Sequence, residues 1–410
     1  MINVLKFGKP ETTINKMYSL KDDFLKFQAK TNPYPLSLEI KKAKGSYITT
    51  TDGKKYLDFI AGVSACSLGH LHPKVTSAIK TQIKKYMHVM VYGEFIQAPA
   101  VKLCKELLKL LPKNQETIYL TNSGTEAIEG AIKLAKKATG REELISAFNS
   151  YHGSTHGSLS LLGSRSQKMG YGPMLPKVKF IKFNHENDLK KITKNTAAVL
   201  LETIQGGAGF IVPDLNYLKK VKSRCDSMGT LLILDEIQPG FGRTGRFFGF
   251  EHFDVEPDII VMGKGMGGGL PVGAFSSSHN LMKHFQDKPK LGHITTFGGN
   301  PVIAAASLAT LRVLRDSKLI SQIEKKEALF RKELKHPQIK EIRGKGLMLA
   351  AIVKNEEMVD KIIEKCIKKR VLVFRLLWEK KALRISPPLT ISVNEIKKGC
   401  TIIRQVLDSL

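Results

Sequence analysis

The sequence predicts an α/β protein in which a mostly parallel sheet is covered by helices on both faces, with a smaller α+β domain beside it. Two observations predict this. Apolar segments of about four to six residues alternate with helical segments of about 12–16 residues between positions 117 and 262. These short segments are apolar at nearly every position, which is typical of strands buried on both faces.

The expected elements follow in chain order. A helix over 17–30 ends at a turn formed by Asn32, Pro33, Tyr34 and Pro35, and a hairpin over 47–59 turns at Asp52-Gly53. Strands are expected over 117–120, 147–149, 198–202, 231–234 and 259–262, with helices over 125–138 and 215–228. From residue 300 the chain reads as mostly helical, with β-like segments over 346–353 and 371–376 and a final helix over 393–409.

Composition excludes several classes of protein. The 410 residues hold 65 Lys and Arg against 37 Asp and Glu, a net charge of +28. The lysines are dispersed, without a block of like charge or a basic stripe interleaved with aromatics, so we expect no nucleic-acid binding. Such an excess fits solvated helix faces or the attraction of anionic substrates.

The location of the protein is expected to be cytoplasmic, without membrane association. No apolar stretch of about 18 residues could span a membrane, and residues 1–20 lack the apolar core of a secretory signal. The five cysteines are widely spaced and form no Cys-x-x-Cys pair, which argues against disulfides and zinc ribbons.

Ligands of open parallel sheets bind at the carboxyl ends of the strands, so the residues that follow each strand are the informative ones. Ser123, Gly124 and Thr125 follow the first strand and open a helix, which fits a phosphate site but taken alone favours a plain N-cap. Tyr151, followed by His152 and Gly153, offers either a flat face for a planar ligand or a packed turn.

The two later strands are followed by charged residues. Asp235 comes directly after four apolar residues, where an acid is costly unless it meets a positive charge, as in a structural salt bridge or a ligand site. Lys264 stands among glycines at the end of the next strand, and a lysine in a dry pocket becomes a usable nucleophile. The stretch is not a Walker A motif, because no Gly-x-x-x-x-Gly-Lys-[Ser/Thr] occurs.

Taken together, these residues fit one ligand, pyridoxal 5′-phosphate. Lys264 would hold its aldehyde as a Schiff base, and Asp235 would keep the pyridine nitrogen protonated so that the ring acts as an electron sink. Tyr151 would stack on the ring, and Gln238 could hydrogen-bond the ring hydroxyl.

The chain resembles the class III, fold-type I pyridoxal-phosphate aminotransferases of the acetylornithine and ornithine group. The resemblance runs from about residue 47 to the C-terminus, about 90% of the chain. The matching motifs are Asp52-Gly53, Tyr56-Leu57-Asp58, Gly69-His70-Leu71-His72-Pro73, Ser123-Gly124-Thr125-Glu126-Ala127, Tyr151-His152-Gly153, Glu202 with Ile204-Gln205-Gly206, Asp235-Glu236-Ile237-Gln238, Gly242-Arg243-Thr244-Gly245, Gly263-Lys264-Gly265, Thr296-Phe297-Gly298-Gly299-Asn300-Pro301 and Leu383-Arg384-Ile385-Ser386-Pro387-Pro388-Leu389.

The resemblance implies roles and an architecture beyond those read from the residues. His152 would join the cofactor site, Glu202 would line the pocket, and Arg384 would bind the α-carboxylate of glutamate or 2-oxoglutarate in a ping-pong transamination. Thr296 would bind the cofactor phosphate of a neighbouring subunit, which makes a homodimer the active unit. Residues 1–60 would join the small domain, 61–300 would form the large cofactor-binding domain and 301–410 the rest of the small domain. No metal site is expected, although His70 with His72 and His152 with His156 resemble ligand pairs.

Two departures from the family pattern concern the substrate. Ser154 stands where the group commonly has an Arg that binds a substrate carboxylate, and Gly207 stands where it commonly has a Glu that masks the Arg384 position. N-acetylornithine or ornithine remains the first expectation for the donor. Donors left open are 4-aminobutyrate, lysine, a diamine and diaminopelargonate-type substrates, beside a glutamate-1-semialdehyde mutase. A catalytically dead basic scaffold or nucleic-acid binder is the non-enzyme alternative.

Overall fold

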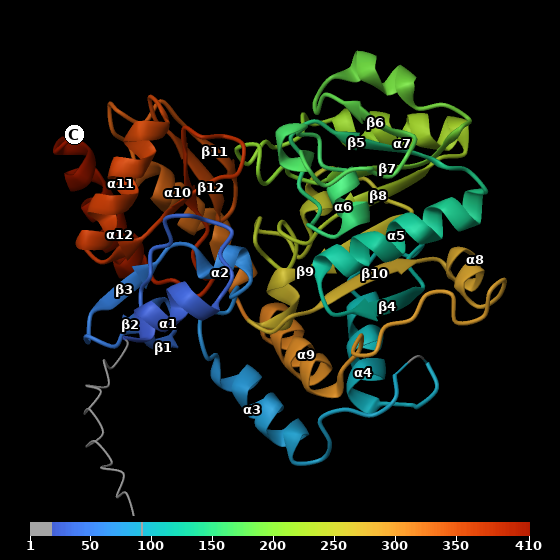
Figure 1. Cartoon of the computed structure of the whole chain (residues 1–410), viewed down its shortest axis with the longest axis horizontal. Coiled ribbons are helices and arrows are strands. Elements are labelled where there is room, and N and C mark those ends of the chain that lie inside the picture. The colour runs from blue at the N-terminus through green and yellow to red at the C-terminus, as the bar shows by residue number, and fades with distance from the viewer. Residues whose placement is uncertain (1–18, 92) are drawn as a thin grey trace, which may run out of the picture.

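The computed structural model describes residues 19–91 and 93–410, and it forms two lobes (Figure 1). The larger lobe is built on a seven-stranded sheet with the strand order β4-β10-β9-β8-β7-β5-β6. β9, β8, β7, β5 and β6 run parallel, and β10 runs antiparallel to both of its neighbours. The strands are β4 (Thr117–Thr121), β5 (Glu143–Ala147), β6 (Val178–Ile181), β7 (Thr196–Glu202), β8 (Leu231–Asp235), β9 (Ile259–Gly263) and β10 (Gly273–Ser277).

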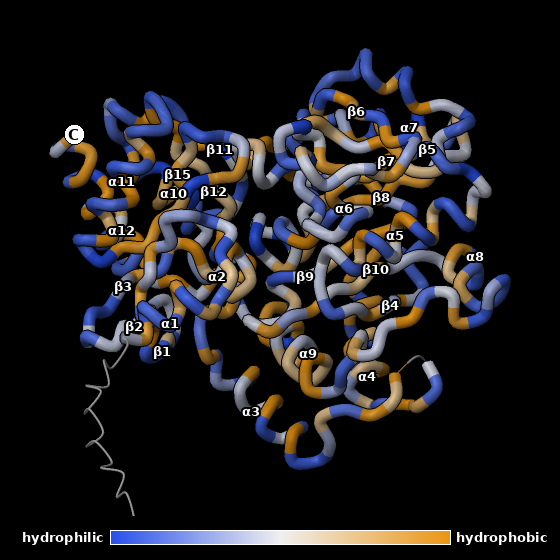
Figure 2. The backbone as a smooth tube through the Cα atoms, viewed as in Figure 1, coloured by the Kyte–Doolittle hydropathy of each residue, from blue (hydrophilic) through white to orange (hydrophobic). Residues whose placement is uncertain are grey.

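Both faces of this sheet are buried, as the continuous apolar segments predict. Along β7, Ala198 and Leu200 belong to one hydrophobic cluster, whereas Val199 and Leu201 belong to the other. α5 (Gly124–Thr139) contributes to the first cluster, and α4 (Ala98–Leu108), α7 (Tyr217–Met228) and α9 (Pro301–Asp316) contribute to the second. Figure 2 shows the apolar character of β7 and β8. A Val or Leu side chain of this kind contributes about 1.5–3 kcal/mol on full burial.

The carboxyl ends of the parallel strands meet at one edge of the sheet. β4 is antiparallel to β10, which is antiparallel to β9, so β4 points the same way as β9. Glu202 on β7 pairs in register with Asp235 on β8, which pairs with Val261 on β9. The side chains that follow these strands are therefore gathered at this edge.

The smaller lobe holds two further sheets, each of four strands. One consists of β1 (Ile40–Lys44), β2 (Tyr47–Thr50), β3 (Lys55–Asp58) and β13 (Val371–Leu372); the other consists of β11 (Glu341–Lys345), β12 (Met348–Ile352), β15 (Ala382–Ile385) and β14 (Phe374–Arg375). β13 pairs in parallel with β3, so a C-terminal strand continues the N-terminal sheet. This pairing supports the grouping of the two chain ends, and the domain limits at residues 60 and 300 stay a prediction.

The structure describes eight further α-helices. They are α1 (Leu20–Phe27), α2 (Ala61–Ser64), α3 (Pro73–Ile83), α6 (His156–Ser160), α8 (His279–Met282), α10 (Ile323–Glu333), α11 (Glu356–Lys368) and α12 (Val393–Asp408). The predicted hairpin, the helices that became α5, α7 and α12, and the strands that became β4, β7, β8, β9 and β12 are confirmed. The start of the helix predicted over 17–30 and most of the region examined for a secretory signal lie outside the described residues.

One strand prediction is wrong. The strand expected over 147–149 ends at Ala147, because Asn149 has a left-handed φ of 58° and turns the chain away. The β-like segment expected over 371–376 is confirmed as two short strands, β13 and β14, which belong to different sheets. β10 was not predicted, because its Gly-Ala-Phe-Ser-Ser sequence lacks the continuous apolar character of its neighbours.

Arg243 connects the lobes. Its guanidinium is fully buried, and Nη1 donates to the carbonyls of Leu347 and Pro387 while Nη2 donates to Ser67 Oγ at 3.4 Å. Burial lowers the pKa of Arg243 to about 9. The Gly-Arg-Thr-Gly motif therefore has a structural contact of its own, which fixes the Pro387-Pro388 turn that follows β15.

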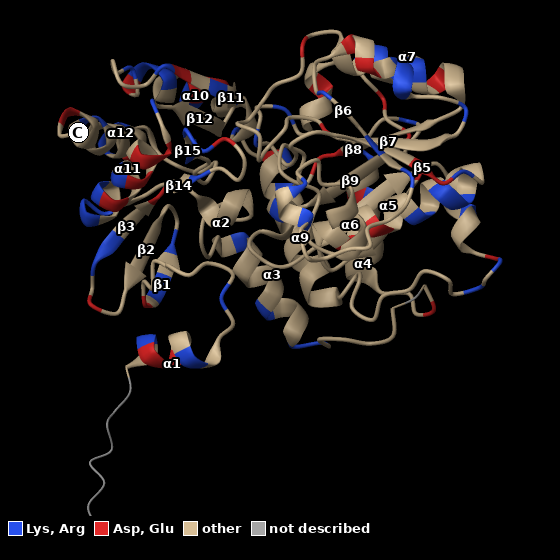
Figure 3. Cartoon of the chain, turned by 45° about the horizontal axis from the view of Figure 1, so that its top comes forward, with Lys and Arg blue, Asp and Glu red and all other residues tan. Residues whose placement is uncertain are grey.

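The surface carries charges of both signs. Lys residues are interspersed with Asp and Glu along α11, whereas α7 carries four Lys and Arg residues and one acid, Asp226 (Figure 3). Among the described residues, no helix is long and apolar enough to cross a membrane. All five cysteines are free thiols.

Candidate active site

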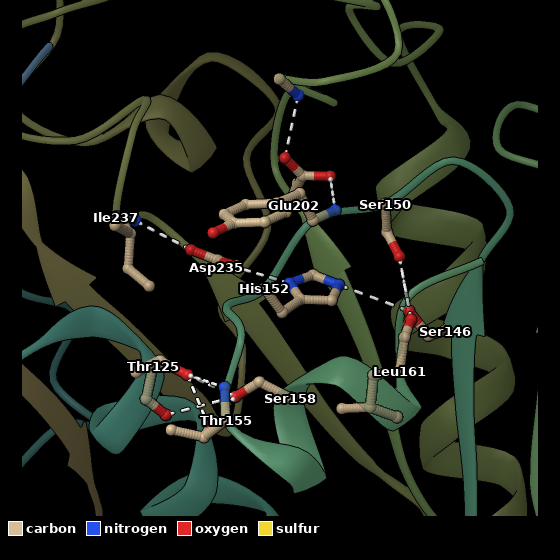
Figure 4. Close-up of polar contacts among 12 residues, drawn as sticks. Thr125, Ser146, Ser150, His152, Thr155, Ser158, Leu161, Glu202, Asp235 and Ile237 are labelled. Atoms are coloured by element: carbon tan, nitrogen blue, oxygen red, sulfur yellow. Dashed lines mark hydrogen bonds and ion pairs between the residues drawn. The ribbon is translucent and has the colours of Figure 1, made fainter. Parts of the chain in front are cut away.

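Asp235 ends β8 with a carboxylate that is 3% exposed. Its Oδ2 lies 2.8 Å from His152 Nδ1, and its Oδ1 accepts a hydrogen bond from the Ile237 amide at 3.0 Å. The His152 ring is buried between this carboxylate and Ser146 Oγ, which lies 3.3 Å from Nε2 (Figure 4). His152 thus stands behind Asp235 and orients it.

Lys264 follows β9 directly, on a backbone with a left-handed φ of 39°. Burial lowers the pKa of its amine to about 8; the nearby Arg384 acts in the same direction, and the charges of Asp235 and Glu202 oppose it. A lysine with such a pKa holds a useful fraction of neutral, nucleophilic amine near pH 7. The turn around it is tightly packed, because a Cβ at Gly265 would lie 2.6 Å from Ser67 Oγ.

Glu202 ends β7 and connects two segments of the site. Oε2 accepts from the Tyr151 amide at 3.1 Å, and Oε1 accepts from the Gly206 amide at 2.9 Å (Figure 4). Burial raises the pKa of this carboxyl to about 7, and the charge of Asp235 adds to the shift. Glu202 fixes the backbone on both sides of the pocket.

The start of α5 has features of a plain N-cap and features of a phosphate site. Ser123 is the N-cap, with Oγ accepting from the Glu126 amide at 3.3 Å. Thr125 Oγ1 lies 2.7 Å from Thr155 Oγ1. A Cβ at Gly153 would lie 2.2 Å from the same Thr125 Oγ1. The first amides of this 16-residue helix have no acceptor within the helix, and the positive end of its dipole faces the same edge of the sheet. An anion fits there.

Tyr151 and Gln238 are each held by one serine. Tyr151 Oη lies 3.2 Å from Ser154 Oγ, and Gln238 Nε2 donates to Ser64 Oγ at 3.3 Å. Ser64 belongs to α2, a turn in which every residue has a positive φ, including the β-branched Val63. Such strain is typical of functional sites. Sequence reasoning missed Ser64, since no spacing or motif signals a left-handed turn of non-glycine residues.

Arg384 lies on β15 and is 5% exposed. Its Nε and Nη1 have no hydrogen-bond partner within the described part of the chain, and its Cζ lies 5.6 Å from the centroid of the Phe210 ring. Burial lowers the pKa of the guanidinium to about 10, so it stays charged at pH 7. A buried cation with two unused donors fits a carboxylate ligand.

Thr296 is exposed, beside a Phe297 side chain that is 53% exposed. Its other neighbour, Thr295, accepts through Oγ1 from Asn122 Nδ2 at 2.8 Å, and Asn122 immediately precedes the N-cap of α5. Thr296 therefore lies on the surface close to the candidate phosphate site.

Three of the four histidines in the two pairs have polar partners in the protein, whereas the buried Nδ1 of His72 has none within the described residues. His70 Nε2 lies 2.8 Å from Asp58 Oδ2, which with Cys66 raises the pKa of His70 to about 9. His156 Nε2 lies 2.6 Å from the Pro173 carbonyl oxygen. Between residues 19 and 410, position 92 apart, no group of three or more His, Cys, Asp and Glu side chains could hold a metal ion.

The residues gathered at this edge fit pyridoxal phosphate. A buried lysine with a lowered pKa, a buried carboxylate and an aromatic side chain accompany the start of a long helix. Gly124 leaves no room for a side chain, because a Cβ there would lie 2.7 Å from Ile237 Cδ1. These are the four kinds of group that the cofactor requires.

Comparison with known proteins gives a consistent result. The family model for class-III aminotransferases matches residues 28–407. The chain is 38% identical to the acetylornithine aminotransferase of Bacillus subtilis, over 90% of this chain and 95% of that protein. It is 37% identical to ornithine aminotransferase 1 of Staphylococcus aureus, over 94% and 97% of the two chains.

Solved structures resemble most of the chain. The ornithine aminotransferase of Toxoplasma gondii superposes with a TM-score of 0.88 at 31% identity and covers 96% of each chain. A second crystal structure of that enzyme is described with partial occupancy of pyridoxal phosphate at its active site. These structures confirm the predicted fold class.

Proposed function

The chain belongs to the class-III aminotransferase family and is a pyridoxal-phosphate-dependent aminotransferase, and we propose that N-acetylornithine or ornithine is its amino donor and 2-oxoglutarate its acceptor. The placement of Lys264 and Asp235 on neighbouring strand ends, close enough for the Asp235 charge to act on the lysine, carries the assignment of the site. The choice of donor is based on the relatives named acetylornithine aminotransferase and ornithine aminotransferase.

Lys264 has two roles in this proposal. Its neutral amine would hold the cofactor aldehyde, and Nζ, when free, would remove and return the proton at the substrate carbon. Pyridoxal phosphate supplies an electron sink that makes this carbon acidic. A pKa of about 8 suits both roles, since the amine gains and loses a proton near neutral pH.

Asp235 stabilises the proton on the pyridine nitrogen, because its carboxylate is buried and charged groups interact strongly there. His152 is a positioning residue that holds Oδ2. Ser123, Gly124 and Thr125 bind the phosphate with the first amides of α5. Tyr151 stacks on the ring, and Gln238, held by Ser64, hydrogen-bonds its hydroxyl.

The substrate pocket is formed by three residues. Arg384 pairs with the substrate carboxylate through donors that have no other partner within the described residues. Glu202 lines the wall and holds the Tyr151 backbone. Ser154, a neutral hydroxyl on the Tyr151 phenol, supplies no charge for a second carboxylate. This last feature favours a second candidate class, ω-amine donors such as diamines or diaminopelargonate-type substrates.

A homodimer is part of the proposal, with Thr296 of one subunit binding the cofactor phosphate in the other. Exposed apolar side chains near this segment support a second copy as the partner, among them Met87, Phe95, Ile96 and Phe297. His88 and Phe297, with ring centroids 4.7 Å apart, connect the two segments that carry these residues. The free thiols support the cytoplasm as the location.

The experiment that tests the donor is a half-reaction. The holoenzyme is mixed with N-acetylornithine, ornithine, 4-aminobutyrate, lysine or putrescine, one at a time, and the loss of its visible absorption is followed. The proposal predicts the fastest loss with N-acetylornithine or ornithine. Faster loss with putrescine would transfer the assignment to the ω-amine class, and a protein that stays colourless with pyridoxal phosphate would contradict the site itself.

A further inference from the structure

Trp378, the only tryptophan of the chain, packs directly against Gly207. A Cβ at Gly207 would lie 2.7 Å from Trp378 Nε1 and 2.9 Å from Cδ1, far inside normal contact distance. The backbones are also joined, because the Trp378 amide donates to the Gly207 carbonyl at 2.9 Å. Gly207 does not adopt a positive φ, so the indole rather than the backbone conformation excludes a side chain at this position.

The loop 206–210, which Trp378 contacts, connects two parts of the active site. At its start, the Gly206 amide binds Glu202, and a Cβ at Gly206 would lie 2.6 Å from Gln238 Oε1. At its end, the buried Phe210 ring lies beneath the Arg384 guanidinium. A displacement of this loop therefore moves the support of Arg384.

A second contact holds the same loop from the Trp378 side. Glu379, which follows Trp378, forms an ion pair with Arg343 at 3.0 Å. A Cβ at Gly209 would lie 3.1 Å from Arg343 Nη1 and 3.3 Å from Glu379 Cβ. The loop is thus held at Gly207 by the indole and at Gly209 by this ion pair.

The space beside Gly207 is lined by the neutral side chains of Trp378 and Leu377. Arg384 takes part in none of the ion pairs found among the described residues, and its Nε and Nη1 are buried without a partner. The volume beside Gly207 holds a neutral indole whose own buried Nε1 is also unpartnered. Arg384 is therefore kept free for a carboxylate that comes with the substrate.

We propose that Trp378 is a specificity-determining positioning residue: by filling the volume beside Gly207 it fixes loop 206–210, and through Phe210 it sets Arg384 for carboxylate binding. The substrate class that follows is amines and oxo acids carrying a carboxylate, in preference to diamines and simple amines. This inference rests on the proposed function, because it concerns the Arg384 pocket of the same site.

A double-mutant cycle tests the contact. The ligand is glutarate, a dicarboxylate without an amine, and its Kd for the holoenzyme is measured by calorimetry in the wild type, Gly207→Ala, Trp378→Ala and the double variant. Gly207→Ala is expected to weaken binding about tenfold, close to 1.4 kcal/mol. The same substitution made in the Trp378→Ala background is expected to have little effect, because the indole that it would meet is gone.

The matched control is Leu377→Ala, which truncates the exposed neighbour of Trp378 and should leave the Kd for glutarate unchanged. If Trp378→Ala does not fold, Trp378→Phe, which retains a smaller ring, takes its place. The Kd of Trp378→Phe for glutarate should lie above that of the wild type. Equal Kd values for the wild type, Gly207→Ala and Trp378→Phe would overturn the inference. Failure of the wild type to bind pyridoxal phosphate would instead refute the proposed function, so the two failures are distinct.

Discussion

The carboxylate of Asp235 and the imidazole of His152 are joined by a 2.8 Å contact between Oδ2 and Nδ1, and both side chains are buried. Asp235 lies at the end of β8, while His152 comes from the turn after β5, so the pair links two strands of the sheet. The imidazole fixes one carboxylate oxygen, and the Ile237 amide fixes the other. The proposed partner of the cofactor nitrogen is thus held before any ligand arrives.

Asp235→Asn should lower kcat/KM by about a hundredfold or more. An amide keeps the shape but not the charge, and loss of one partner from a buried charge pair costs about 3–5 kcal/mol. The rate of the half-reaction with N-acetylornithine measures this. Ser146→Ala is the matched control: it removes the weaker contact on the far side of His152 and should cost less than about tenfold. Equal effects of the two substitutions would mean that the charge of Asp235 is not used.

The rate at which the apoenzyme captures pyridoxal phosphate should rise with pH and level off above a midpoint near pH 8. Only the neutral amine of Lys264 reacts, and burial lowers its pKa to about 8 from the ordinary 10.5. Stopped-flow absorbance across pH 6 to 10 gives the profile. In Arg384→Ala the midpoint should move upward, since a like charge that lowers this pKa has been removed. A midpoint near 10.5 in the wild type would show that Lys264 is not desolvated.

Arg384→Ala should raise the KM for 2-oxoglutarate by about 30-fold or more and change kcat less. Truncating one partner of a buried charge pair costs about 2–5 kcal/mol, and here the loss falls on substrate binding. Steady-state kinetics with a fixed donor separate the two parameters. Arg384→Lys should recover part of the affinity, because it keeps the charge without the bidentate geometry. An unchanged KM would assign Arg384 a purely structural role.

Ser154→Arg should raise kcat/KM for N-acetylornithine relative to putrescine by about tenfold. The new guanidinium would stand beside the Tyr151 phenol, which Ser154 Oγ now contacts, and would supply a bidentate partner for a distal carboxylate. Ser154→Gln, which is nearly as long but uncharged, is the control. An unchanged ratio in Ser154→Arg would show that position 154 does not face the distal end of the donor.

The central sheet and its charged residues were predictable because their signals are local. A strand buried on both faces is apolar nearly throughout, so the sequence marks Asp235, which ends one such strand, and Lys264, which directly follows another. Ser64 and Trp378 gave no signal, because their roles depend on contacts with Gln238 and Gly207 that are distant in sequence. The strand wrongly predicted over 147–149 has a similar cause, because the left-handed φ of Asn149 depends on the surrounding structure and not on the local sequence pattern.

The most direct test of the account is to locate the lysine that holds the cofactor. The holoenzyme is reduced with borohydride, digested and mapped by mass spectrometry, with Lys264→Ala treated in parallel. A phosphopyridoxyl group is expected on the peptide that contains Lys264, and no peptide of the variant should carry the group in a one-to-one ratio. Stoichiometric labelling of another lysine, or an unlabelled wild type, would contradict it.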